Sequence, residues 1–225
     1  MLRSDIIYVN RAVITQELQM LPEIWFTISL IYAVFIFWYY NWKGPLTRSE
    51  IDRYTLLLKQ QISDPEIYNA IAHFMHKDDG KGFVMLNMIV FQKGLINHPV
   101  TSEPLKSQAL LLEYFKPFSS QILRRAGHPV LQATLRAGYI EAWGVEPNPG
   151  WQLVGLIRYR SRRDMLDLIT ADAFHAVHDY KKAAILKTLA MPMQIRSSLF
   201  ASPPVWSAML LFILGQIITI LNLMP

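Results

Sequence analysis

Cysteine is absent from this 225-residue sequence. Without a thiol, the chain forms no disulfide, and it offers neither a thiolate nucleophile nor a cysteine-ligated metal site. The sequence also lacks a phosphate-binding P-loop, a GxGxxG fingerprint and a nucleophile elbow. We therefore assign no catalytic residue, no metal site and no cofactor from the sequence, and we favour a role other than catalysis.

Charge is missing from the last 23 residues, Pro203 to Pro225. A helix rises about 1.5 Å per residue, so about 20 apolar residues cross the hydrocarbon core of a bilayer. A core helix of a soluble domain would show a polar stripe at helical period, whereas the polar side chains in this run are few and scattered: Ser207, Gln216, Thr219 and Asn222. The pattern predicts a transmembrane helix over residues 203–225.

A second apolar run extends from Ile24 to Trp42 and predicts a transmembrane helix over residues 22–42. Aromatic residues cluster at its far end, as in the belts that lie at the headgroup level of a membrane: Trp38, Tyr39, Tyr40 and Trp42. These bulky residues and the following Lys43 do not fit the cleavage site of a signal peptide, so we expect the helix to be retained. Residues 1–21 mix apolar and polar positions at roughly helical spacing, which predicts an amphipathic leader on the membrane surface.

Positive charge is concentrated between the two apolar runs. Residues 43–202 hold 20 of the 22 Lys and Arg residues and 14 of the 17 Asp and Glu residues. Because Lys and Arg near the spans favour the cytoplasmic side, we expect residues 43–202 to be cytoplasmic and both termini to lie across the bilayer. The basic balance suits anionic lipid, and the sequence carries no nucleic-acid-binding motif. The expected partners are therefore the lipid bilayer and integral-membrane proteins, with no nucleic acid.

Two helices are expected directly after the first apolar run. Thr47 and Glu50 form a capping box, and apolar residues recur on one face of the helix that follows. Asp64, with proline next to it, marks the start of the second helix. We interpret residues 43–79 as a juxtamembrane helical arm.

The remaining segment alternates strands and helices. FVMLNMIVF, residues 83–91, is nearly continuous in apolar character, which predicts a central strand covered on both faces, with Asn87 the lone polar side chain on its face. The later elements are expected to be a helix from Thr101 or Ser102 to Gly127, one or two strands over 128–144, a strand over 151–159, a helix from Ser161 towards Leu189, and a short edge strand over 190–195. This βαββαβ order predicts an α+β, ferredoxin-like domain over residues 80–196.

The same segment resembles the dimeric α+β barrel superfamily, in particular its EthD-like and function-unknown members. The residues that carry the resemblance are the opening strand FVMLNMIVF, the helix leading to ILRRAGHPV, the strand WQLVGLIRYRSRRDM and the helix with ADAFHAVHDYK. The resemblance implies a sheet with helices on one face and a second copy of the chain on the other, and hence a homodimer through the sheet. It also implies a pocket bordered by His128, and haem held by one histidine is known among distant members.

Aromatic and polar side chains of this domain are the expected lining of such a pocket: Asn87, Tyr114, Phe118, His128, Trp143, Tyr159, Phe174 and His175. The aromatic residues also suit an ordinary core, and both interpretations stay open. Two histidine pairs at i, i+3 spacing, His73 with His76 and His175 with His178, each lie on one helical face and could bring two imidazoles to a metal. We favour a polar face or a helix end for both pairs.

RYRSRR, residues 158–163, is the densest charge run. One interpretation is that Arg158 or Arg160 holds an anionic substrate through two parallel hydrogen bonds. The alternative, which we favour, is a strand end that emerges into solvent, with its charges facing phospholipid headgroups or an acidic partner. We therefore expect a basic docking patch formed by Arg158, Arg160, Arg162 and Arg163.

Two functions fit these observations. The first is a non-catalytic, membrane-anchored accessory or assembly subunit, in which the spans and the basic patch attach a ferredoxin-like domain to a larger integral-membrane complex. The second is a small membrane-bound enzyme or binding protein that takes an apolar ligand, or haem, into the pocket of the domain. The absence of a nucleophile, a metal motif or a cofactor fingerprint favours the first.

Overall fold

The computed structural model describes residues 2–198 and 202–223, with backbone alone for residues 2–20, Ala173, His175, Ala176 and Leu223. The chain divides into two compact units. One contains the two terminal helices, and the other extends from Tyr40 to Arg196.

The terminal unit consists of helix α1 (Leu2–Tyr39) and helix α7 (Pro203–Leu223). The residues expected to form a separate leader continue the same helix, α1, as the apolar run that follows them. Each helix contains a stretch long and apolar enough to cross a membrane, Leu21–Tyr39 in α1 and Pro203–Asn222 in α7. These stretches are apolar by composition and mostly exposed in the unit.

Helices α1 and α7 pack against each other through aromatic and small residues. The rings of Trp25 and Phe212 lie 5.7 Å apart, and the Tyr32 hydroxyl donates a hydrogen bond to the Pro204 carbonyl at 3.2 Å. A Cβ at Gly215 would come within 2.8 Å of the Trp25 ring, so glycine allows the close approach of the two helices.

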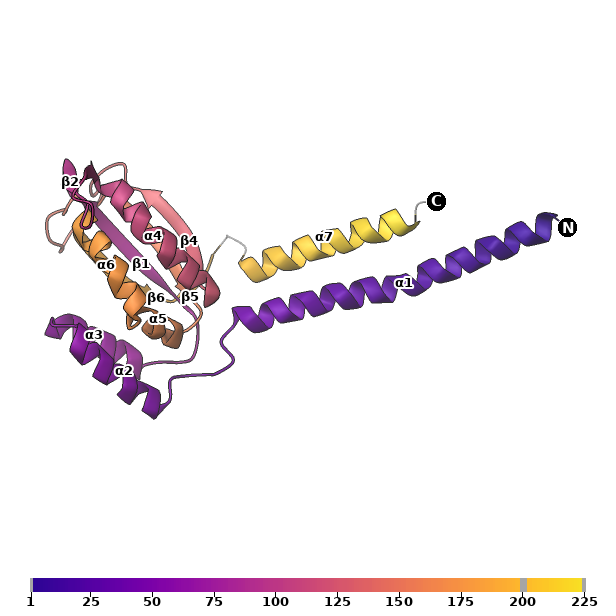
Figure 1. The fold of residues 1–225 in the computed structure, drawn as a ribbon, viewed down its shortest axis with the longest axis horizontal. Helices are drawn as coiled ribbons and strands as arrows, with labels where there is room; N and C mark the ends of the chain where they lie inside the picture. The colour runs from indigo at the N-terminus through magenta and orange to yellow at the C-terminus, as the bar shows by residue number, and fades with distance from the viewer. Residues whose placement is uncertain (1, 199–201, 224–225) are drawn as a thin grey trace. The chain divides into compact units, whose positions relative to one another are not determined.

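The second unit is built on a four-stranded antiparallel sheet (Figure 1). Its strands, in chain order, are β1 (Phe83–Phe91), β4 (His128–Thr134), β5 (Leu153–Tyr159) and β6 (Ile185–Met193). Their order across the sheet is β4-β5-β1-β6, with every neighbouring pair antiparallel. This is the strand order of the ferredoxin-like βαββαβ arrangement, so the predicted α+β fold class is confirmed for this unit.

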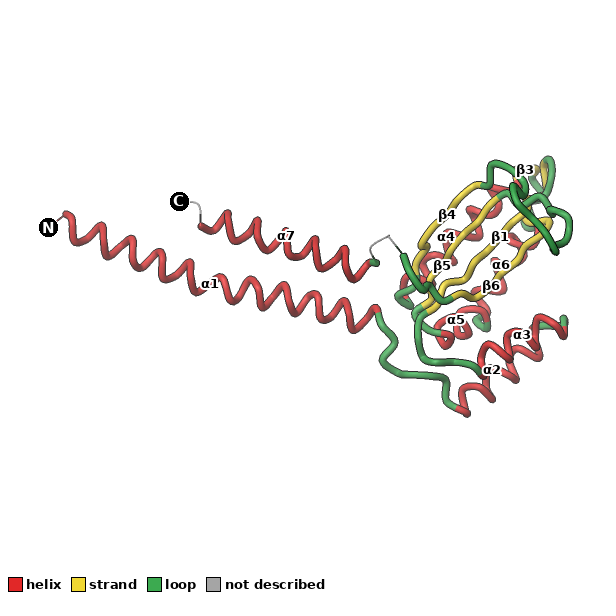
Figure 2. Tube along the Cα trace, turned by 180° about the vertical axis from the view of Figure 1, so that it is seen from behind, coloured by secondary structure: helices red, strands yellow, loops and turns green. Residues whose placement is uncertain are grey.

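Helices α4 (Ser107–Arg124) and α6 (Asp172–Ala184) cover one face of the sheet (Figures 1 and 2). Strand β1 coincides with the predicted central strand and lies between β5 and β6. Its side chains alternate, so that Met85, Asn87 and Ile89 lie on the helix-covered face, while Leu86 and Met88 lie on the opposite face. Figure 2 shows that, within the unit, this opposite face carries no helix.

Helices α2 (Arg48–Gln61) and α3 (Pro65–His76) begin with the predicted caps. Thr47 forms a capping box with Glu50, and the Asp64 carboxylate accepts hydrogen bonds from the first turn of α3. The two helices, which the sequence predicted as a juxtamembrane arm, belong to the same compact unit as the sheet. Tyr54 and Met75 are fully buried in the core that contains Phe83 and Leu166. The amphipathic face of α2 thus packs into this core, and the Tyr54 hydroxyl donates a hydrogen bond at 2.6 Å to Asp167 of α5 (Arg162–Ile169).

Helix α4 begins later than the sequence predicted. The segment before it forms a small hairpin of β2 (Leu95–Asn97) and β3 (Pro104–Lys106). Pro104 disfavours a helical conformation for the residue before it, which explains why a helix starting at Thr101 or Ser102 is not formed. The Ser107 hydroxyl, at the first residue of α4, donates a hydrogen bond to the Gln92 carbonyl at 2.9 Å and fixes the start of the helix.

Gly127 was predicted to end α4, but its role is different. The left-handed residue is Ala126, with a φ of 55°, and the Gly127 N–H bonds to the Ile122 carbonyl at 3.0 Å. A Cβ at Gly127 would lie 2.8 Å from the Arg158 carbonyl oxygen. Glycine is therefore required for the close approach of the chain to β5.

The last third of the unit differs most from the prediction. Ser161 caps a helix as expected, with its Oγ accepting from the Asp164 N–H at 3.1 Å, but that helix, α5, ends at Ile169. After α6, strand β6 begins at Ile185 and pairs with β1 along its length. Strand β6 is therefore longer than the expected 190–195 segment, and it is an edge strand, as Pro192 indicated. Only β4 forms within 128–144 among the described residues.

Candidate functional site

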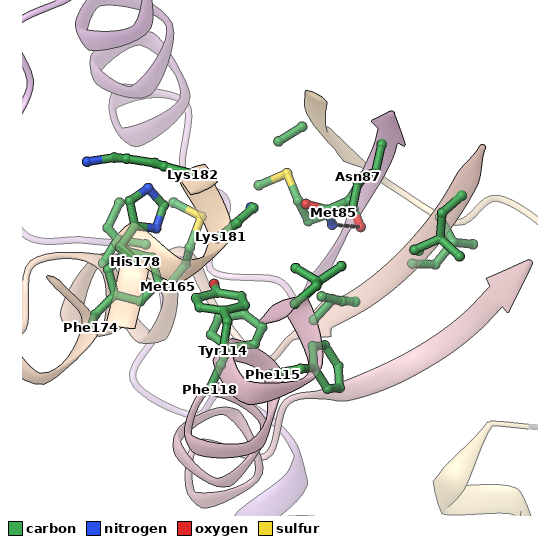
Figure 3. Close-up of a pocket in the computed structure, with 18 of the residues that line it drawn as sticks. Met85, Asn87, Tyr114, Phe115, Phe118, Met165, Phe174, His178, Lys181 and Lys182 are labelled. Atoms are coloured by element: carbon green, nitrogen blue, oxygen red, sulfur yellow. Dashed lines mark hydrogen bonds between the residues drawn. The ribbon is translucent and has the colours of Figure 1, made fainter. Parts of the chain in front are cut away.

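A cavity of about 1260 Å³ lies inside the unit that extends from Tyr40 to Arg196. It is larger than the roughly 300–1,000 Å³ of most small-molecule sites. Its walls come from the helix-covered face of the sheet and from the helices α2, α3, α4, α5 and α6. Figure 3 shows Met85 and Asn87 of β1 facing the helical side chains across it.

The sheet wall has room beside its central strand. Gly155 of β5 pairs with Asn87 of β1, and a Cβ at Gly155 would meet no atom within 4 Å. Ile89 and Ile157 extend this wall on either side. A glycine here leaves open space where any other residue would project into the cavity.

The helical wall is mainly aromatic. The Tyr114 and Phe118 rings of α4 stack at 5.2 Å, and the Phe174 and His178 rings of α6 lie 4.9 Å apart. Met165 of α5 lies next to them (Figure 3). This interlocked set holds the Tyr114 ring in one position, since Phe174 and His178 also pack edge-on against it.

Few charged groups reach the cavity. Lys181 of α6 places its Nζ 5.9 Å from the centroid of the Tyr114 ring, within the range of a cation–π contact. Burial lowers the pKa of Lys181 and raises the pKa of the Tyr114 hydroxyl. Among the described lining residues, Asp64 is the one acid, and its carboxylate is used to cap α3.

Asn87 supplies a neutral polar group to the sheet wall. Its side-chain amide donates to the Met85 carbonyl of its own strand at 3.2 Å (Figure 3). This bond stays within β1, so the Asn87 amide is oriented by its own strand.

The predicted pocket residues are only partly brought together. Those that line the cavity are Asn87, Tyr114, Phe118, Tyr159 and Phe174. His128 is not among the lining residues; it begins β4, where its Nδ1 lies 2.9 Å from the Pro129 carbonyl, and burial lowers its pKa. Trp143 is 76% exposed in the loop after β4. The side chain of His175 lies outside the described part of the structure.

Sequence reasoning missed several lining residues, above all Lys181, His178 and the α3 side chains Ile67 and Ile71. A signal was present, because Phe174, His178 and Lys181 follow i, i+4, i+7 spacing and share one helical face. Within the described residues, no group of three or more His, Asp or Glu side chains could hold a metal ion.

The four arginines of the expected docking patch make contacts inside the unit instead. Arg163 binds Glu50 through two hydrogen bonds, of 2.6 and 2.9 Å, and also donates to the Pro45 carbonyl at 3.0 Å. Its side chain is 10% exposed. The Arg163 guanidinium lowers the pKa of Glu50 to about 2. This ion pair fastens the start of α2 to α5.

The other three arginines are engaged in the same way. Arg162 pairs with Asp78 at 3.4 Å and lies over the Phe74 ring at 4.2 Å. Arg160 binds Asp164 at 2.6 Å, and Arg158 donates to the Ala126 carbonyl at 2.7 Å. The expectation of an exposed basic patch is therefore revised, because carboxylates and carbonyls of the same unit, most of them distant in sequence, bind these arginines.

No protein-family model and no curated protein matches this sequence. Solved structures do match the fold. RPA0582 of Rhodopseudomonas palustris, a protein of unknown function, is 15% identical in its methylated form, with a TM-score of 0.50 over 62% of this chain and 96% of that chain. A second structure of RPA0582 is 16% identical, with a TM-score of 0.48 over 61% of this chain and 97% of that chain.

A further match is SnoaB of Streptomyces nogalater, a cofactor-independent oxygenase, which is 12% identical with a TM-score of 0.35 over 54% of this chain and 99% of that chain. At these identities, similarity shows the fold alone. The unit that extends from Tyr40 to Arg196 therefore shares the fold of RPA0582, an α+β fold with a four-stranded antiparallel sheet in ferredoxin-like strand order.

Proposed function

We propose that this chain is a membrane-anchored protein that binds an apolar ligand in the cavity of its ferredoxin-like unit. The cavity is the observation that carries the proposal. Small-molecule sites are concave spaces lined mainly by apolar side chains, and a cavity of about 1260 Å³ is large enough for such a ligand. Most of its lining is aliphatic or aromatic, which suits a ligand with a large apolar body.

The terminal helices support the membrane part of the proposal. A single helix of about 20 apolar residues is long enough to span a bilayer, and α1 and α7 each contain such a stretch. Their packing through Trp25, Phe212 and Gly215 resembles the small-residue contacts that membrane helices use. A bilayer also dissolves apolar molecules, so the anchor keeps the cavity close to a source of ligand.

The test is a titration of the full-length chain in a non-ionic detergent with Nile red, a neutral apolar dye. Gly155→Phe places a ring in the open space beside Asn87 and is expected to weaken binding about tenfold or more, because it occupies the volume that the dye needs.

Val130→Phe is the matched control, since Val130 is exposed on β4 and does not line the cavity. Its binding curve should equal that of the unmodified chain. Equal binding by all three proteins would mean that the dye does not use the cavity, and the proposed function would then be rejected.

A second function, that of an accessory subunit docked on a membrane complex, is favoured by the sheet face opposite the cavity. Leu189 and Met191 on this face are 44% and 42% exposed, and Leu86 and Met88 beside them are half-buried. A second copy of the chain, or a partner protein, would cover this apolar surface. Purification in mild detergent separates the two cases, because a partner of fixed stoichiometry supports a subunit and a lone homodimer does not.

A further inference from the structure

We propose that Lys181 and the hydroxyl of Tyr114 form an anion-binding site inside the cavity, which holds the carboxylate of a ligand with a long apolar body. This inference rests on the proposed function, because it assigns the chemical class of the ligand in the same cavity.

Lys181 has no counter-ion among the residues whose side chains the structure describes. No carboxylate in the described part of the chain lies within ion-pair distance of its Nζ, whose recorded contact is with the Tyr114 ring. A buried charge is costly unless it is paired, and burial acts on Lys181 by disfavouring its charged form. An anionic group of a ligand would supply the missing partner.

The neighbouring lysine shows the contrast on the same helix. Lys182 pairs with Asp179 at 3.2 Å, and its side chain is 66% exposed. Its charge is therefore both solvated and neutralised. Lys181, one residue earlier, is half-buried beside the Tyr114 ring and has no carboxylate partner among the described residues, so the two lysines differ in their surroundings.

Tyr114 supplies a second donor at the same place. Its ring is buried and stacked on Phe118, which fixes the position of the hydroxyl (Figure 3). Burial raises the pKa of this hydroxyl, so it keeps its proton at neutral pH and can donate. No hydrogen bond from the Tyr114 hydroxyl to another described residue is present. Two donors without acceptors, in a space with no free acid, are complementary to an oxyanion.

The rest of the cavity selects the body of the ligand. The walls beyond the two donors are mainly aliphatic and aromatic, and they include Met85, Ile71 and Phe115. Lys182 also lines the cavity but already pairs with Asp179, so Lys181 is the one lining lysine without a carboxylate among the described residues. One such lysine matches a single negative charge, so a monocarboxylate fits better than a phosphate or a diacid. A long-chain or polycyclic monocarboxylic acid meets both requirements.

The experiment compares cis-parinaric acid, a fluorescent long-chain carboxylate, with its methyl ester on the full-length chain in a non-ionic detergent. The acid should bind about tenfold or more tightly than the ester, because a hydrogen-bonded ion pair forms only with the acid. Lys181→Met should remove this preference, Lys181→Arg should retain most of it, and Tyr114→Phe should reduce it several-fold. Lys116→Met, an exposed lysine of α4 outside the cavity lining, should leave it unchanged.

A second measurement needs no variant. Amine labelling followed by mass spectrometry should show Lys181 protected by cis-parinaric acid and not by the ester. Equal affinity for acid and ester, or an acid preference that persists in Lys181→Met, would overturn the anion site while the cavity itself still binds Nile red. Loss of Nile red binding in the cavity as well would overturn the proposed function together with the inference.

Discussion

Arg163 and Lys181 are both cations on helices of the same unit, yet their surroundings differ. Arg163 is held by the Glu50 carboxylate and by backbone carbonyls, so its charge is satisfied within the fold. Lys181 lies against the Tyr114 ring, with no carboxylate partner among the described residues. The comparison indicates that the Arg163–Glu50 ion pair stabilises the fold, whereas Lys181 remains available to bind an anionic group of a ligand.

The largest expected effect on stability comes from the loss of the Arg163–Glu50 ion pair. Arg163→Met should destabilise the full-length chain by about 3 kcal/mol, because it leaves Glu50 without its partner at the start of α2. Thermal and urea unfolding, followed by circular dichroism, measure the loss. Lys182→Met is the control, since it removes an exposed ion pair and should change stability by less than about 1 kcal/mol. If Arg163→Met also changed stability by less than about 1 kcal/mol, the proposed contrast between Arg163 and Lys181 would be wrong.

The same substitution at Lys181 should raise the free energy of unfolding, not lower it. Lys181→Met replaces an unpaired cation with an apolar side chain of similar length and should stabilise the ligand-free chain by about 1 kcal/mol. The same unfolding measurements apply, after bound ligand has been removed with a hydrophobic resin. Clear destabilisation would mean that Lys181 has a structural partner and is not reserved for a ligand.

Acid should weaken the Arg163–Glu50 ion pair in a defined pH range. The pKa of Glu50 falls from 4.5 to about 2 in the folded chain, chiefly through its hydrogen bond with Arg163. A carboxylate with a lowered folded pKa contributes stability that is present above its unfolded pKa and is lost as pH falls through the folded value. As the pH falls from about 5 to about 2, roughly the range between the two pKa values, the melting temperature should fall less in Glu50→Gln than in the unmodified chain. Parallel curves for the two proteins would contradict this assignment.

The substitution with the smallest expected structural effect tests the predicted membrane topology. A cysteine at Lys81, in an exposed loop before β1, would be the one thiol in the chain. Because Lys and Arg are concentrated between the apolar runs, this loop should be cytoplasmic and protected from an impermeant thiol reagent in intact cells. Labelling of intact cells would reverse the predicted topology.

Local signals predicted part of the fold with good accuracy. The capping box at Thr47 and the apolar run of β1 depend on residues close together in sequence, and both match the structure. The α5–α6–β6 region was interpreted as one helix and a short strand. That division depends on the pairing of β6 with β1, which is a contact between residues far apart in the chain.

The site was harder to predict for the same reason. The RYRSRR run was expected to face solvent because Glu50, which pairs with Arg163, is 113 residues away in sequence. Lys181 was overlooked because lysines on helices are mostly exposed, and its burial is created by α4 and the sheet. Tyr114, Phe118 and Phe174 were expected near a pocket because large aromatic side chains dominate helix–sheet contacts, and they line the cavity.

The central claim is that the cavity holds an apolar monocarboxylate beside Lys181. The most direct measurement is mass spectrometry of small molecules extracted from the purified full-length chain, compared with Gly155→Phe and Lys181→Met. The account predicts a monocarboxylic acid with a long apolar body, near one per chain, that is strongly reduced in both variants. Recovery of no such acid from the unmodified chain, together with no binding of added cis-parinaric acid, would contradict it.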